Sequence, residues 1–274
     1  MGNPRYQKHH GIETVEQQTI NIHGSLVEEE IIETQQLVIA TNTLPRTDWV
    51  KTRVFSWMAA FLHFDKVIQI PLIMMHELCG ISYRDLIETF TEPAPKSLMV
   101  LQEVQALFQK QAEDMLEGGP DFTRSEEHLN IWWPTDEYAL IKLATEESMW
   151  QGKSKLERFY TEAEVLLSHL AGKRVSLTVL HEAFALNSAL MKLPFQTEDL
   201  ELRFTYNIWE VYQSALKDCS VELASVDSKY HIDRTSQTWD SWDDWCREVI
   251  WYGNKKGAYL YGNRAVEPQL AGHH

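Results

Sequence analysis

The residues best suited to bind a ligand lie near the end of the chain. The segment WYGNKKGAYLYGNR carries Lys255, Lys256 and Arg264, repeats Tyr-Gly-Asn, and contains no acidic residue. Glycine allows backbone amides to approach a ligand closely, and clustered lysines add positive charge, so the segment predicts an anion site or a face for an acidic partner. The alternative is a tail that packs on its own acidic chain through weak, exposed ion pairs. Trp251 and Tyr252 open the segment and belong to the same prediction.

Two other patterns contain metal-binding residue types in the wrong spacing. His76-Glu77 and His181-Glu182 are each half of the zinc-protease motif HExxH. The second histidine is replaced by Gly80 in one case and by an alanine in the other, so two ligands cannot share a helix face. We therefore predict that this chain has no metal site.

The cysteines also argue against a metal-binding or disulfide framework. Cys79, Cys219 and Cys246 are odd in number and far apart, with no CxxC pair among them. We expect three reduced thiols that are mostly buried, because free cysteine behaves as a small hydrophobic residue.

Composition narrows the class of protein. The net charge of −15 and the pI near 5.2 exclude nucleic acid as a general partner, because phosphate contacts need a basic face. No apolar run is long enough for a membrane span, and the first residues lack an apolar signal core, so we expect a cytoplasmic protein without membrane contact. Ten tryptophans predict a half-polar cleft or an interface.

The first 45 residues predict β-structure. Segments 19–23 and 26–41 flank a turn at 23–25, and the continuous apolar run 37–40 is typical of a strand buried on both faces of a parallel sheet. Four polar residues follow this run: Thr41, Asn42, Thr43 and Arg46. Because ligands gather at the carboxyl ends of parallel strands, these residues are predicted to face an active centre. The alternative, of equal weight, is a strand end capped by the chain's own helix.

The remaining chain predicts helices with short breaks, and hence a mainly α fold. The expected helices are 54–64, 70–78, 83–90, 95–116, 135–150, 153–170, 176–193, 208–216 and 239–251, with a strand at 200–208 and a short strand at 258–261. The first of them is apolar on every side, which predicts burial all round. Arg53 lies one turn before Trp57 and would need an acidic partner or a bound anion. Asn187, on an apolar stripe, is expected to satisfy a backbone group, with a cleft-lining role as the alternative.

A second aromatic pattern lies just before the tail. Trp239, Trp242 and Trp245 recur at a spacing of three, which places them along one broad helix face. This face predicts packing against the core. The alternative is an aromatic wall for a flat or cationic ligand.

Three blocks of the sequence resemble a known family. ETQQLVIATNTLPRTDWVKTRVFSWMAAFLHF, HELCGISYRDLIETF and WDSWDDWCREVIWYGNKKGAYLYGN resemble the C-terminal region of cobalamin-binding radical S-adenosylmethionine (radical SAM) proteins. The resemblance runs over most of the chain, although none of the blocks is a catalytic signature.

The resemblance implies a larger enzyme around this chain. Such an enzyme has a cobalamin-binding domain, then a partial (β/α) barrel whose CxxxCxxC motif holds a [4Fe-4S] cluster and binds S-adenosylmethionine, and then a variable C-terminal region that helps close the substrate side. Residues 1–45 would be the end of the barrel, and residues 46–274 the helical C-terminal domain with a short β/turn tail. This chain lacks CxxxCxxC, so no cofactor is expected in the chain itself.

The resemblance implies that this chain is the substrate-side region of a cobalamin-dependent radical SAM enzyme and is inactive alone. Its partner would be the rest of that enzyme or another copy of this chain. One alternative is a stand-alone binding or scaffold protein with no redox role. A third is a metal-independent enzyme that uses a tryptophan-lined cleft. The catalytic residues are not identified by any of these hypotheses.

Overall fold

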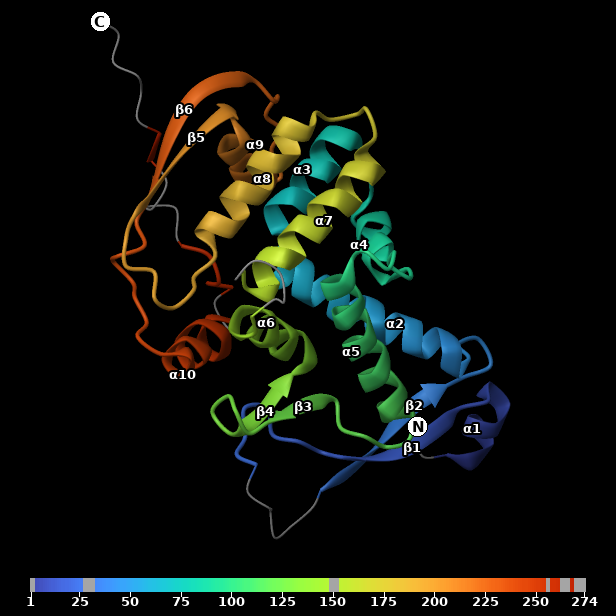
Figure 1. Cartoon of the computed structure of the whole chain (residues 1–274). Coiled ribbons are helices and arrows are strands. Elements are labelled where there is room, and N and C mark those ends of the chain that lie inside the picture. Colours follow the sequence, from blue (N-terminus) through green and yellow to red (C-terminus); the bar gives the residue numbers. More distant parts are fainter. Residues whose placement is uncertain (1–2, 27–32, 148–152, 255–256, 262–266, 269–274) are drawn as a thin grey trace, which may run out of the picture.

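The polypeptide forms a body of packed helices with small antiparallel sheets around it (Figure 1), which confirms a mainly α fold. The computed structural model describes residues 3–26, 33–147, 153–254, 257–261 and 267–268. The helices are α1 (Pro4–His10), α2 (Arg46–Ala59), η1 (Ala60–Phe64), α3 (Gln69–Cys79), α4 (Tyr83–Thr91), α5 (Met99–Leu116), α6 (Thr135–Thr145), α7 (Lys155–Ala171), α8 (Leu177–Leu190), α9 (Ile208–Ala215), α10 (Trp242–Trp245), η2 (Cys246–Trp251) and α11 (Tyr252–Asn254). The strands are β1 (Glu13–Gln18), β2 (Thr34–Ala40), β3 (Phe122–Ser125), β4 (Ile131–Pro134), β5 (Leu200–Tyr206), β6 (Ser225–Ile232) and β7 (Glu267–Pro268).

The N-terminal β-structure differs from its prediction. β2 pairs antiparallel with β1, not within a parallel sheet, and the two form a two-stranded sheet. Ile39 and Ala40 are buried, while the first residues of β2 are exposed, so a strand buried on both faces is wrong here. The segment 19–23 is not a strand, because β1 ends before it. The turn predicted at 23–25 lies slightly earlier, over 21–24, where the Gly24 N–H donates to the Asn21 carbonyl at 2.7 Å and His23 has φ 58°. Periodicity indicated a strand but could not identify its neighbour.

The predicted all-round apolar helix packs into the core, but burial on every side is wrong, because Phe64 is 68% exposed. α2 packs against α5 and α4, and its last turns widen into the π-helix η1, whose Phe61 and Leu62 are fully buried. A sharp turn follows, in which Lys66 has the left-handed φ of 61°, and α3 then leaves at 95° to the preceding helix. This turn positions two charged side chains, Asp65 and Lys66, inside the fold.

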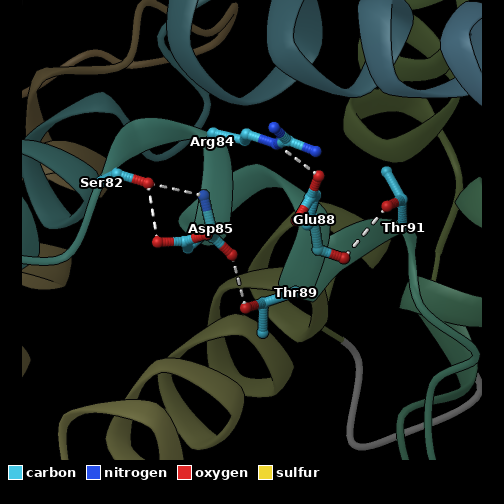
Figure 2. A network of polar contacts seen from close by, with 6 residues as sticks. All are labelled: Ser82, Arg84, Asp85, Glu88, Thr89 and Thr91. Atoms are coloured by element: carbon cyan, nitrogen blue, oxygen red, sulfur yellow. Dashed lines mark hydrogen bonds and ion pairs between the residues drawn. The ribbon is translucent and has the colours of Figure 1, made fainter.

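Side-chain caps fix the ends of several helices. Ser154 and Glu157 form a reciprocal capping box at the start of α7. Ser82 caps α4, accepting from the backbone N–H of Asp85 at 3.1 Å and donating to its carboxylate at 2.7 Å. The other polar contacts drawn in Figure 2, including Arg84 with Glu88 at 2.8 Å, also join residues of this helix. The second resembling block therefore spans the end of α3, a turn and most of the well-capped helix α4.

The C-terminal aromatic segment is less helical than predicted. The helix expected over 239–251 begins only at Trp242 and continues as the π-helix η2. Trp239 precedes it, and its indole donates to Glu248 at 3.0 Å; Trp245 is fully buried and donates to the Lys192 carbonyl at 2.7 Å. The indole donors of these two tryptophans are thus satisfied by the chain, which favours packing over a ligand-binding wall.

Most other boundaries lie close to their predictions, with three clear exceptions. The helix expected over 54–64 already begins at Arg46. The helix expected over 135–150 ends at Thr145, and the segment 258–261 makes a single antiparallel bridge, Met191 with Leu260, instead of a strand. No single helix in the described ranges is long and apolar enough to cross a membrane; the bent pair Arg46–Phe64 and Gln69–Cys79 reaches that length and composition only when taken together.

Candidate functional site

The turn after η1 carries two ionisable side chains, Asp65 and Lys66, which enter two different sites. Asn187, on α8, holds this turn: its amide nitrogen donates to the carbonyls of Lys66 at 3.0 Å and Val67 at 2.7 Å, and its oxygen accepts from the N–H of Ile70 at 3.0 Å. The prediction that Asn187 satisfies backbone groups is confirmed. Its effect is to place the Asp65 carboxylate in a buried acidic cluster and the Lys66 ammonium at the wall of a cavity.

A second segment runs beside this turn and completes both sites. Residues 259–261 of the tail lie antiparallel to the end of α8: the N–H of Lys192 donates to the Tyr259 carbonyl at 3.0 Å, and that of Tyr261 donates to the Leu190 carbonyl at 2.8 Å. Tyr259 reaches the acidic cluster and Tyr261 lines the cavity. This part of the tail packs on the chain through Tyr259, Leu260 and Tyr261, all buried, whereas the exposed ion pairs of the alternative prediction would involve residues outside the described part of the chain.

The cavity has a volume of about 850 Å³ and is the stronger candidate for a binding site. Lys192 is only 8% exposed, and Lys66 is half-buried. Within the described residues neither ammonium group forms an ion pair with a carboxylate. The wall is completed by Leu190, Trp209, Tyr212, Gln213, Leu216, Asp233, Ser236, Gln237, Gly257, Ala258, Leu260 and Tyr261. In a chain with a net charge of −15, this is a locally positive cavity.

The surroundings of both lysines destabilise their charged form. Burial lowers the pKa of Lys66, and burial together with repulsion from Lys66 lowers the pKa of Lys192. The nearby carboxylate of Asp233 accepts the N–H of Ser236 at 2.8 Å, in the turn after β6. Lys192 also lies over the ring of Tyr261, at 6.0 Å from its centroid. An anion bound between the two ammonium groups would relieve their burial and their mutual repulsion.

The acidic cluster lies on the other side of the same turn. Asp65, Asp136, Glu137 and Tyr259 interact there, and Glu137, which is fully buried, contacts the ring of His23 at 2.9 Å. Burial raises the pKa of Asp65 well above its ordinary range, with further contributions from the other two carboxylates. Burial and then Glu137 raise the pKa of Asp136 to about 7. Carboxyl groups in this arrangement can hold and share a proton near neutral pH.

The second large cavity, of about 790 Å³, lies between α2, α4 and α5. Both of its cations are paired with carboxylates, Arg84 with Glu88 at 2.8 Å and Lys51 with Asp48 at 3.5 Å, and a further acid, Glu92, also lines it. Since both cations are compensated, this cavity has less to offer an ionic ligand than the lysine-lined one.

The residues predicted at the strand end do not join either site. Thr41 accepts the N–H groups of Thr43 and Leu44, and Asn42 donates to the His9 carbonyl at 3.0 Å. Arg46 pairs with Glu13 at 2.8 Å on the surface. These residues therefore form a turn held by the chain's own N-terminal segment, and their role toward an active centre stays a prediction.

The other predicted residues have mixed placements. Arg53 pairs with Asp121 and lies 4.8 Å from the ring centroid of the buried Trp57, so its acidic partner is found within the chain. Trp251 is half-buried beside His23, and Tyr252 stacks on it with half of its surface exposed. Lys255 and Lys256 lie outside the described residues.

Sequence reasoning missed Lys66 and Lys192. Both stand in apolar surroundings, FDKVIQI and ALMKLPF, where a charged side chain is unusual. That signal was readable, but only the fold shows that the two ammonium groups share one cavity.

The residues of this chain do not fit a [4Fe-4S] cluster. The three cysteines lie in different parts of the fold, at the end of α3, after α9 and in η2. Burial raises the pKa of the Cys246 thiol to about 12, which opposes the thiolate form that binds iron. Among the described residues, no group of three or more His, Cys, Asp or Glu side chains is placed to hold a metal ion.

Comparison with known protein families and with curated proteins finds no match to this chain.

Proposed function

We propose that this chain is the C-terminal, substrate-side region of a cobalamin-dependent radical SAM enzyme, and that it binds a ligand without carrying out the radical chemistry itself. The [4Fe-4S] cluster, S-adenosylmethionine and cobalamin belong to the rest of that enzyme. On this proposal residues 1–45 continue the barrel and residues 46–274 form the covering domain.

The observation that carries the proposal is that the third resembling block lines a cavity together with Lys66, which follows the end of the first block by two residues. The first block ends at Phe64, directly before Asp65 and Lys66, and the third contains Gly257 to Tyr261. A Cβ atom placed on Gly257 would lie 3.9 Å from the Lys66 ammonium nitrogen. Segments distant in sequence thus build one site, as expected if the resemblance reflects a shared binding function and not only a shared core.

The second edge of β2, which pairs with no strand among the described residues, is consistent with this role. β2 pairs with β1 on its other side, and a strand with a free edge is a template for a further strand. In the complete enzyme this edge would be the place where the chain joins the barrel.

The alternative is a stand-alone binding protein, for which the lysine-lined cavity would serve as the binding site. The two functions make the same prediction for ligand binding and different predictions for partners.

Reconstitution of the complete enzyme distinguishes them. The radical polypeptide, carrying CxxxCxxC and the cobalamin domain, is prepared with and without this chain, and substrate turnover is measured anaerobically. We expect turnover only when the chain is present. Equal turnover in its absence contradicts the proposal and leaves the stand-alone function.

A further inference from the structure

The lysine-lined cavity has the properties of a site for a specific class of ligand. We propose that it binds a dianionic phosphate group, carried on a small apolar or aromatic body, between Lys66 and Lys192. This inference deepens the proposed function by naming the ligand class of the same cavity. Its experiment uses the chain alone, so its failure is distinguishable from failure of the proposed function.

Charge compensation is the first step. A buried lysine without an anionic partner is costly, and proteins therefore pair such charges or use them for binding. Lys192 is 8% exposed, yet its ammonium group has neither a hydrogen bond nor an ion pair among the described residues. The cavity is the open space beside it. A ligand anion is the missing partner that the cavity can admit.

The second step concerns the charge of that anion. Lys66 and Lys192 line the same cavity, and repulsion from Lys66 adds to burial in lowering the pKa of Lys192. A monoanionic carboxylate neutralises one ammonium group and leaves the other buried. A phosphate monoester carries a charge near −2 at neutral pH and neutralises both. The pair therefore favours phosphate over carboxylate.

The backbone around the lysines supports this choice. Gly257, at φ 58°, lies beside the Lys66 ammonium group and has no side chain to obstruct an approaching oxyanion. The backbone of Lys66 is fixed by the hydrogen bonds from Asn187 to the carbonyls of Lys66 and Val67. The base of this side chain is thus positioned before binding, which lowers the entropic cost of ordering it.

The third step concerns the body of the ligand. A volume of about 850 Å³ is far larger than a phosphate ion and lies within the range of small-molecule sites. Trp209, Leu216 and Leu260 line it, so much of the wall is apolar. Trp209 is only partly buried and presents a flat surface on which an aromatic ring can stack. A phosphate on an aromatic or apolar body therefore fits better than a free phosphate.

The test is a calorimetric titration of the full chain with phenyl phosphate, inorganic phosphate, benzoate and phenol. We expect the affinity order phenyl phosphate, then inorganic phosphate or benzoate, then phenol. Lys192→Met should weaken phenyl phosphate binding by at least about tenfold, the usual effect of losing one charge-assisted contact. Lys66→Met should have a similar effect, and Trp209→Leu should weaken phenyl phosphate binding while leaving inorganic phosphate unchanged.

Lys173→Met, which removes an exposed lysine outside the cavity, is the matched control and should bind like the wild type. Circular dichroism checks that each variant is folded; should Lys66→Met not fold, Lys192→Met alone decides, because it removes only an unpaired charge. Absence of phenyl phosphate binding at about 10 mM would refute the site, since weaker binding is not specific. Equal affinity of Lys192→Met and the wild type would also refute it, and benzoate binding as tightly as phenyl phosphate would refute the dianion.

Discussion

Because of the acidic cluster, the free energy of unfolding should decrease as the pH rises. Asp136→Asn should remove much of this pH dependence. The pKa of Asp136 is about 7 in the folded chain, against an ordinary value of 3.8. Between these values the folded state binds more protons than the unfolded state, so the free energy of unfolding decreases from about pH 4 to about pH 7. The full difference corresponds to about 4 kcal/mol. Because Asp136 keeps partial solvent contact, we expect about 2 kcal/mol.

Asparagine does not titrate, so the variant should match the wild type near pH 4 and be more stable by about 2 kcal/mol at pH 8. For a chain of this size that corresponds to a melting temperature higher by about 4–8 °C. The assay is urea unfolding followed by tryptophan fluorescence at a series of pH values. Asp48→Asn, which changes an exposed acid in the first turn of α2, is the matched control and should shift stability by less than about 1 kcal/mol at any pH. Parallel stability curves for the wild type and Asp136→Asn would refute the reasoning.

Three further predictions follow from the same fold. Asn187→Leu should destabilise the chain by about 3 kcal/mol or more, because it leaves the Ile70 N–H and two carbonyls unsatisfied; a loss below about 1 kcal/mol in urea unfolding contradicts this. Lys192→Met should stabilise the ligand-free chain by about 1 kcal/mol, since it removes a buried charge that has no ion pair among the described residues, and an unchanged or lower melting temperature is the contrary result. Reconstitution of the isolated chain with iron and sulfide should give no [4Fe-4S] cluster, and a stoichiometric cluster absorbance would disprove the expectation.

Local signals predicted much of the fold. Apolar periodicity located α3, α4, α7, α8 and α9, and hydroxyl residues such as Ser82 and Ser154 cap the starts of two of them. The need of Asn187 and Arg53 for polar partners was also predictable, because a buried polar group must be satisfied. These inferences depend on the nearest residues along the chain and hence on the sequence alone.

Long-range pairing was not predictable in the same way. β2 has the residues of a buried strand, but its partner β1 leaves half of it exposed. The π-helical turns of η1 and η2 arise where helices meet the core and have no periodic signature. The candidate site depends on both effects, because η1 sets the turn at Asp65 and Lys66, and the tail reaches that turn only through tertiary packing.

The most direct test of the central claim is to isolate this chain, anaerobically, from the cells that make it and to identify by mass spectrometry what accompanies it. The account predicts peptides from a CxxxCxxC-bearing radical domain and a cobalamin-binding domain, in equal amount to this chain, either in the same polypeptide or in a bound partner. Recovery of the chain without any such sequence would contradict its assignment to the substrate side of a radical SAM enzyme.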